Sequence, residues 1–315
     1  MNSRNKVLIT GATGFVGRAL VTELLIQQAN IVVGVREFST KLPKEVKQQV
    51  VGDLLENTNW LDTIRDIDVI VHAAARVHVM NDNVLDPLAE FRMVNVDGTV
   101  NLARQAMKSG VKRFVFISSI KVNGEMTKPG QPFTANDNIN VTDPYGLSKY
   151  EAEQALLALT KDSEMDIVIV RPPLIYGRDV KANFQAMIRW VAKGIPLPLA
   201  LANNKRSFIA IDNMVDFIIC CINHPNVKNE VFLVSDGQDI SIAELLQKIA
   251  RALNKKSRLF PVPICFMTIL MKAIGKGDVS DRLFGYLQVD SSKAEKVLGW
   301  KPVITMDEQL RKMVG

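Results

Sequence analysis

Cysteine is scarce in this sequence: its 315 residues include three, Cys220, Cys221 and Cys265. Each lies in an apolar run, and none belongs to a C-x-x-C or Cys/His spacing of the kind that holds a metal ion. The sequence therefore predicts small buried thiols, no disulfide framework and no metal site. Free thiols and the lack of a secretory leader indicate a reducing, cytoplasmic location.

Aromatic residues are also few, at 6% of the chain, and the basic residues are spread along the sequence without aromatic interleaving. This is not the pattern of a nucleic-acid-binding surface, so we expect no nucleic-acid partner. An anionic small-molecule substrate explains the net charge of +6 more simply.

Long apolar runs are missing as well. The longest in the C-terminal half covers residues 262–274, with Pro263 near its start and Lys272 near its end. It is far shorter than the roughly 20 residues needed to span a bilayer, so no integral membrane segment is expected. The run predicts a buried or amphipathic helix, and contact with a membrane surface is the alternative.

What the sequence does have is alternation of short apolar runs with helical periodicity. This pattern predicts an α/β fold, a Rossmann-type doubly wound parallel sheet with a smaller mixed α/β lobe for the substrate. The boundary falls near residue 175, giving domains 1–175 and 176–315, and the chain crosses between them more than once. Strands are expected at 6–10, 31–35, 49–51, 69–72, 113–118, 167–170, 208–211 and 231–234. Helices are expected at 17–29, 87–109, 145–159, 183–193, 212–223, 241–253, 265–274 and 292–298.

A glycine-rich loop, "VLITGATGFVG" at 7–17, follows the first strand and opens the first helix. In this context Gly11 makes the tight turn, Gly14 lets the backbone approach a pyrophosphate, and Gly17 lets the helix pack closely. The N–H groups and partial positive charge of the helix N-terminus then favour phosphate. The sequence predicts a dinucleotide here, and the loop also contributes Thr13, Phe15 and Val16.

The residue after the second strand bears on the choice of cofactor. An NAD site usually has an acidic residue there for the ribose 2′-hydroxyl, whereas an Arg favours the 2′-phosphate of NADP. Arg36 occupies this place, which favours NADP(H), and Glu37 follows it. A shift of one residue in the strand end would place the Glu37 carboxylate at the ribose, so NAD(H) stays open.

A Tyr and a Lys four residues apart, Tyr145 and Lys149, lie at the start of a predicted helix and share one face. A neighbouring ammonium and a positive nicotinamide ring would favour the phenolate and lower the Tyr145 pKa. Tyr145 would then move a proton at a carbonyl or hydroxyl while hydride moves at the same carbon. Ser119, at the carboxyl end of an earlier strand, would hydrogen-bond the same oxygen.

Together these features resemble the extended short-chain dehydrogenase/reductase superfamily, in its NAD-dependent epimerase/dehydratase branch. The resemblance covers nearly the whole chain. It is carried, in the family's order and spacing, by "TGATGFVG" (10–17), "GDL" (52–54), "HAAA" (72–75), "NVDGT" (95–99), "SSIKVNG" (118–124), "YGLSK" (145–149), "RP" (171–172) and "RSFIAIDNMVD" (206–216).

The resemblance implies further residues for the cofactor. Asp53 and Leu54 would flank the adenine, and Asn95 would support the active-site helix. Lys149 would also reach the nicotinamide ribose, and Tyr145 is expected among the cofactor-binding residues. The dinucleotide would further be lined by Ala73, Ala74, Ala75 and Pro172.

The resemblance also implies a nucleoside-diphosphate-sugar site. Asn183 and Arg206 match positions that bind the diphosphate, Arg282 is a further candidate, and Ser119 and Lys121 would face the sugar. Arg–phosphate pairs suit such a site.

Two positions depart from the family's pattern. Ile120 and Lys121 stand where dehydratases have an Asp–Glu pair, which argues against dehydration. Leu174 stands where many relatives have Asn, so one polar contact to the sugar is missing.

The resemblance suggests chemistry at carbon 4 of a UDP-sugar. Our first hypothesis is a 4-keto reductase that forms UDP-N-acetylquinovosamine from UDP-2-acetamido-2,6-dideoxy-xylo-hexos-4-ulose for bacterial surface polysaccharide. The alternative is a UDP-hexose or UDP-N-acetylhexosamine 4-epimerase with tightly bound NAD. A non-catalytic NADP-binding sensor is a third possibility, against which the intact Ser119, Tyr145 and Lys149 argue. A homodimer is expected, with the helices at 88–109 and 145–159 pairing across a two-fold axis.

Overall fold

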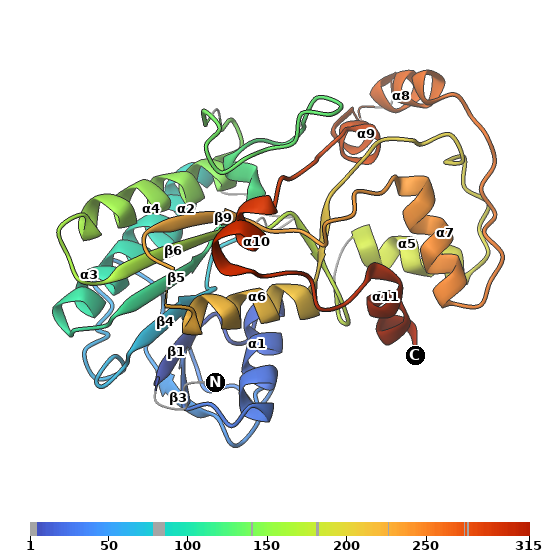
Figure 1. Ribbon diagram of the computed structural model, residues 1–315. Coiled ribbons are helices and arrows are strands. Elements are labelled where there is room, and N and C mark those ends of the chain that lie inside the picture. Colours follow the sequence, from blue (N-terminus) through green and yellow to red (C-terminus); the bar gives the residue numbers. More distant parts are fainter. Residues whose placement is uncertain are drawn as a thin grey trace.

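The computed structural model describes residues 5–77, 86–139, 141–180, 183–225, 227–273, 275 and 277–315, apart from the side chains of Asn183, Asp278 and Arg282. Within these residues the chain forms a parallel sheet of seven strands in the order β3-β2-β1-β4-β5-β6-β9 (Figure 1). The strands are β1 (Val7–Thr10), β2 (Ile31–Val35), β3 (Lys47–Val50), β4 (Val69–His72), β5 (Arg113–Ile117), β6 (Asp166–Arg171) and β9 (Glu230–Leu233). The strand order reverses between β1 and β4, so the predicted Rossmann-type α/β fold is confirmed.

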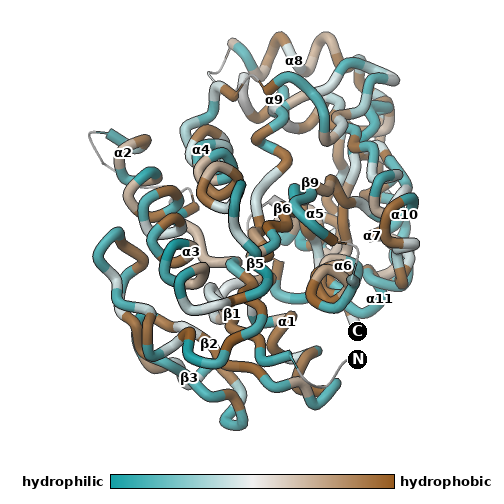
Figure 2. Tube along the Cα trace, turned by 60° about the vertical axis from the view of Figure 1, so that its left-hand side comes forward, coloured by the Kyte–Doolittle hydropathy of each residue, from teal (hydrophilic) through white to brown (hydrophobic). Residues whose placement is uncertain are grey.

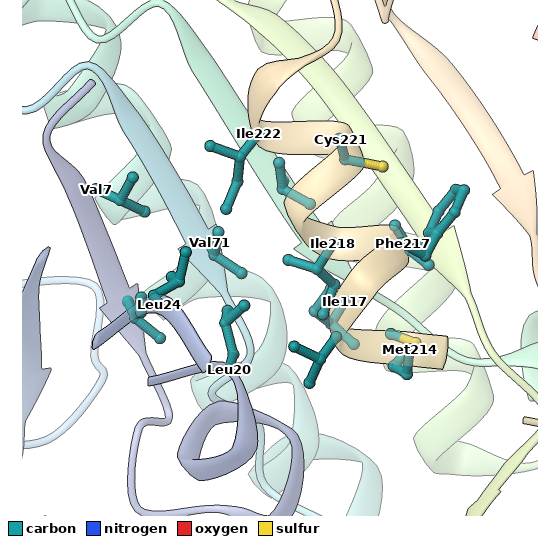
Figure 3. Close-up of a cluster of buried hydrophobic side chains, with 14 of the residues drawn as sticks. Val7, Leu20, Leu24, Val71, Ile117, Met214, Phe217, Ile218, Cys221 and Ile222 are labelled. Carbon is teal, nitrogen blue, oxygen red and sulfur yellow. The ribbon is translucent and has the colours of Figure 1, made fainter. Parts of the chain in front are cut away.

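Helices cover both faces of this sheet, which explains why its strands read as continuous apolar runs. Successive side chains of β1 point to opposite faces, so Ile9 packs with α1 and α6 whereas Leu8 packs on the side of α3 and α4. Figure 3 shows Leu20 of α1 and Ile218 of α6 on the same face as Val71. The bounds of these helices are α1 (Phe15–Ile26), α3 (Thr99–Lys108), α4 (Pro144–Thr160) and α6 (Ile211–Asn223).

The helix expected at 87–109 is a continuous helical run in three parts: α2 (Pro87–Arg92), a π-helical turn η1 (Met93–Gly98) and α3. Gly98 is required here because a Cβ at this position would lie 2.6 Å from the Leu54 carbonyl oxygen. Single π-turns inside helices often mark functional sites. This one holds Asn95, which is buried.

The second lobe has its own core, which includes Phe184, Leu245 and Leu310. Its elements are β7 (Leu174–Tyr176), α5 (Asn183–Ala192), β8 (Phe208–Ala210), α7 (Ile242–Ala252), α8 (Ile264–Ala273), α9 (Gly277–Phe284) and α11 (Met306–Val314). Two elements after residue 175, α6 and β9, belong to the large sheet and its cover, and α10 (Ser292–Leu298) packs beside β9. The division into 1–175 and 176–315 remains a prediction.

One expectation about the apolar segments is wrong, and one of two alternatives for another is excluded. Cys221 is buried and Cys220 is half-buried, but Cys265 is exposed to solvent. All ten residues of α8 are described and none of them is buried, so the run at 262–274 does not form a buried helix. Among the described residues, no helix has the length and apolar character that crossing a bilayer requires.

Candidate active site

Five strand ends meet at one edge of the sheet, and the predicted cofactor residues follow them. The glycine loop follows β1, Arg36 follows β2, Ala73 follows β4, Ser119 follows β5 and Pro172 follows β6. In an open parallel sheet, ligands bind outside these carboxyl ends, where the strand order reverses. Here that point lies between β1 and β4.

The glycine loop fits close backbone packing. Gly11 has φ +70°, and a Cβ there would lie 2.6 Å from the backbone of Ala73 and Ala74. A Cβ at Gly17 would lie 2.2 Å from the Gly11 carbonyl oxygen, so this glycine packs α1 against the turn. A Cβ at Gly14 would lie 3.1 Å from that same oxygen, a less severe approach. Since no side chain in the described part of the chain caps α1, its first N–H groups are available to an anion.

His72, at the end of β4, is fully buried beneath this loop. Its ring nitrogens lie 2.7 Å from Thr10 Oγ1 and 2.9 Å from Thr99 Oγ1, so it joins β1 to α3. Burial, followed by the nearby Lys149, lowers the His72 pKa to about 3. A neutral ring can serve both threonines as donor and acceptor. We therefore assign His72 a structural role that its place in "HAAA" did not reveal.

Asn95 connects the π-turn to the active-site helix. Its Oδ1 accepts a hydrogen bond from the Arg76 backbone N–H at 2.8 Å, and its Nδ2 donates to Ser148 Oγ at 3.0 Å. Ser148 Oγ in turn donates to the Tyr145 carbonyl at 2.8 Å. These bonds fix the first turn of α4, which bears Tyr145.

Tyr145 and Lys149 lie in the first turns of α4, whose N-cap is Asp143. Burial, with a smaller effect of Asp143, raises the Tyr145 pKa to about 12, so the lowering expected from the sequence is not produced by the chain itself. Burial lowers the Lys149 pKa to about 7, against the opposing charge of Glu153. The Lys149 ammonium lies 3.9 Å from the centre of the Phe116 ring and has no hydrogen-bond partner among the described residues.

Ser119 and Lys121 follow β5 and lie beside the N-terminus of α4. Ser119 Oγ accepts a hydrogen bond from the Lys121 backbone N–H at 3.2 Å, as the N-cap of the short 3₁₀ turn 120–122. The Lys121 ammonium donates to Asp143 Oδ1 at 3.0 Å and lies 3.6 Å from Glu125. Lys121 thus holds the side chain that caps the Tyr145 helix.

A buried ion pair lies one turn beyond Lys149, and the sequence did not reveal it. Arg171 Nη2 donates to Glu153 Oε2 at 2.5 Å and Arg171 Nε donates to Oε1 at 3.0 Å. Ser118 Oγ also donates to Oε1, and Arg171 Nη1 donates to Asn123 Oδ1. The pair ties α4 to β6 behind the site.

Arg36 and Asp53 come together beyond the ends of β2 and β3. Their side chains are 80% and 70% exposed, and Arg36 Nη1 lies 3.9 Å from Asp53 Oδ1. The guanidinium that we expected to receive a 2′-phosphate therefore has a carboxylate beside it. Leu54 is half-buried next to Asp53.

In the second lobe, Arg206 Nη1 donates to the Gly285 carbonyl at 2.9 Å, and burial lowers its pKa. The side chains of Asn183 and Arg282 lie outside the described residues, although their backbones lie in α5 and α9. Leu174 is half exposed at the start of β7. A groove of about 690 Å³ between α1, α6 and α11 contains none of Ser119, Tyr145 and Lys149.

The features at the sheet edge fit a dinucleotide. The donors are the unpartnered ammonium of Lys149 and the free backbone N–H groups at the uncapped N-terminus of α1, and ribose hydroxyls and a pyrophosphate accept from such groups. The glycines of the loop leave room for a close approach. Lys149 would serve the ribose, and the loop 11–17 the pyrophosphate.

Comparison with known proteins places this chain in a family of nucleotide-dependent enzymes. The model of the NAD dependent epimerase/dehydratase family matches residues 7–235. The chain is 50% identical to the UDP-glucose 4-epimerase of Vibrio cholerae, covering 96% of this chain and 92% of that protein. It is 30% identical to the N-acetyl-alpha-D-glucosaminyl-diphospho-ditrans,octacis-undecaprenol 4-epimerase of Escherichia coli O157:H7, covering 86% and 82%. The solved structure of MoeE5 in complex with UDP-glucose and NAD has the same fold, with a TM-score of 0.77, 23% identity and coverage of 98% and 97%.

Proposed function

We propose that this chain, which belongs to the NAD dependent epimerase/dehydratase family, is a 4-epimerase of UDP-hexoses or UDP-N-acetylhexosamines that works with bound NAD. The observation that carries this proposal is the 50% identity to a UDP-glucose 4-epimerase over nearly the full length of both chains. The site agrees, because Ser119, Tyr145 and Lys149 are all held at the carboxyl edge of the sheet.

Each of these residues has a role in epimerisation. Tyr145 takes the proton from the sugar O4 and later returns it, and Ser119 hydrogen-bonds the same oxygen. The Lys149 ammonium binds the ribose and raises the positive charge near the phenol. NAD, when bound, accepts and returns the hydride of carbon 4 and adds a positive charge beside Tyr145. That charge would oppose the effect of burial, which alone raises the Tyr145 pKa to about 12.

The geometry around Arg36 supports NAD over NADP. A 2′-phosphate at Arg36 would also meet the Asp53 carboxylate, which lies 3.9 Å from the guanidinium. Like charges so close disfavour each other, although exposure of both side chains screens the effect. The bound NAD of MoeE5 and the NAD-dependent family point the same way. The NADP(H) preference predicted from Arg36 has no support beyond that residue.

The comparisons give the 4-keto reductase hypothesis less support than the epimerase. A reductase would need the same Ser119, Tyr145 and Lys149, so the site alone does not separate the two reactions. Dehydration is disfavoured, since Lys121 is engaged with Asp143 where an acidic pair would act. The expected homodimer, through the helical run of α2, η1 and α3 and through α4, remains part of the proposal.

The test is the reaction without added cofactor. The purified protein should release NAD on acid denaturation and should interconvert UDP-glucose with UDP-galactose, or UDP-N-acetylglucosamine with UDP-N-acetylgalactosamine, as followed by NMR. An enzyme that lacks bound NAD and consumes NADPH with a UDP-4-keto sugar would instead be the reductase.

The diphosphate site has its own test. Arg206→Ala should weaken UDP binding by about 1.5–3 kcal/mol, because a hydrogen bond to a charged group is lost. Arg251→Ala, at an exposed position of α7, is the matched control and should change nothing. Unchanged UDP affinity in calorimetry of Arg206→Ala would mean that the diphosphate lies elsewhere.

A further inference from the structure

One helix of the second lobe exposes apolar side chains in a regular stripe. Phe266, Ile269, Leu270 and Ala273 follow the spacing of one helical face, and all four are exposed, the first three by 62%, 68% and 53%. We call these four residues the outer stripe of α8. A surface helix of a soluble domain normally has polar residues on the side away from the core.

The opposite face of α8 already has partners. Met267 packs against the lobe core, and Thr268 accepts a hydrogen bond from Ser280 of α9 at 3.3 Å. The helix is therefore apolar on both sides, while only its inner side packs on the lobe. Figures 1 and 2 both place α8 at the outer edge of the molecule, beyond α9.

The stretch of sequence that contains α8 is strongly one-sided in charge, although α9, which packs on α8, carries Asp278 and Asp281. Residues 245–277 contain seven basic residues and no Asp or Glu. The whole chain has 39 basic and 33 acidic residues, which leaves 32 basic and 33 acidic outside this segment, so the net positive charge lies within it. The basic residues are Lys248, Arg251, Lys255, Lys256, Arg258, Lys272 and Lys276, of which Arg251, Lys255, Lys256, Arg258 and Lys272 are exposed.

We propose that α8 docks on an anionic lipid bilayer, with its outer stripe among the headgroups and the basic segment 245–277 drawn to the acidic lipids. An exposed apolar stripe combined with clustered Lys and Arg is the pattern of helices that lie in a membrane interface. A second copy of the chain fits less well. It would bring two acid-free basic segments together, and four side chains on a ten-residue helix cover little of the roughly 800 Å² per partner of a stable interface.

Vesicle sedimentation tests this inference, which does not depend on the proposed epimerase activity. The full-length protein should bind vesicles containing phosphatidylglycerol at least about tenfold more tightly than vesicles of phosphatidylcholine alone. Raising NaCl from about 0.1 M to about 0.5 M should weaken that binding, because the Debye length falls. Ile269→Glu should reduce it by at least about tenfold. Ile26→Glu, a control on α1 at an equally exposed position (70%), should not.

The double variant Lys255→Glu/Lys256→Glu tests the charge separately. Each basic residue near an anionic surface contributes about fivefold to binding, so both changes together should lower it by more than about 20-fold. All variants should keep wild-type turnover of soluble UDP-sugar, because they lie on the surface. Equal binding to the two vesicle types, or no binding to either, would overturn the proposal. A dimer that Ile269→Glu dissociates, without vesicle binding, would show instead that the stripe joins two copies.

Discussion

Replacing the active-site lysine by methionine should make the folded protein more stable at neutral pH while abolishing its activity. Lys149 is buried, and its ammonium has no hydrogen-bond partner among the described residues. A methionine has a similar length, carries no charge and makes favourable contacts with aromatic rings such as the neighbouring Phe116. The change therefore removes a charge whose burial is unfavourable and leaves the apolar contacts of the side chain.

The magnitude follows from the Lys149 pKa, which burial lowers from an ordinary 10.5 to about 7. The difference corresponds to about 5 kcal/mol, an upper value because water penetration and relaxation reduce it. Between pH 7 and 10.5 the unfolded chain binds a proton that the folded chain does not, so the wild type gains stability as pH rises through this window. Below pH 7 the folded wild type carries the buried charge, so the full cost of burying it lowers the stability. The free energy of unfolding of Lys149→Met should thus exceed that of the wild type by about 2–5 kcal/mol at pH 6.5. This difference in stability should shrink to nearly zero at about pH 10.

Urea unfolding at pH 6.5, 8 and 9.5 measures this gap. Both proteins must first be stripped of nucleotide, because a ligand that binds only the folded state adds stability of its own. A gap that does not change with pH would show that Lys149 is not a buried ammonium with a lowered pKa. A variant less stable than the wild type at pH 6.5 would refute the reasoning outright.

Three further outcomes are expected. Tyr145→Phe should lower turnover at least about 100-fold while nucleotide binding, measured by calorimetry, stays nearly unchanged; turnover close to that of the wild type would remove Tyr145 from the mechanism. Gly11→Ala should destabilise the fold by more than Gly237→Ala, which has the same left-handed backbone (φ +73°) but nothing within 4 Å of the added methyl, and whose cost in thermal unfolding should be about 1–2 kcal/mol. Glu153→Gln should cost about 3–5 kcal/mol in urea unfolding, because the Arg171 charge would stay buried without its partner; a loss below about 1 kcal/mol would mean that water replaces the carboxylate.

The sheet could be predicted from the sequence because its strands are short apolar runs buried on both faces, and β2, β4 and β5 fall close to where they were expected. Of the two-stranded sheet, β8 was expected at 208–211 but β7 was not, because it is short and directly follows Pro172 and Pro173. The last helix, α11, was missed although Thr305 and Glu308 form a capping box that marks its start. That signal was readable, as Thr-x-x-Glu ahead of an apolar residue.

The site was predictable only where the groups lie close in sequence or follow a strand. Tyr145 and Lys149 are four residues apart, and the glycine loop is contiguous. Glu153 and Arg171 are separated by a helix end and a loop, so no local pattern connects them. The exposure of α8 was equally hidden, because an apolar run gives the composition of a helix and not what covers it.

The Glu153–Arg171 pair explains why the buried Lys149 has no partner of its own. Glu153 lies one turn along α4 and its charge favours the ammonium, yet both of its oxygens are occupied by Arg171 and one also by Ser118. A direct bond from Lys149 to Glu153 would stabilise the lysine, but it would also turn the ammonium away from the sheet edge. By engaging Glu153 from β6 and from Ser118, directly after β5, the fold leaves the Lys149 ammonium for a ligand. A ribose that accepts its hydrogen bonds would offset part of the cost of burying it. The Glu153–Arg171 ion pair thus has two consequences: the unpartnered Lys149 lowers the stability of the fold, and its ammonium is available to bind a ligand.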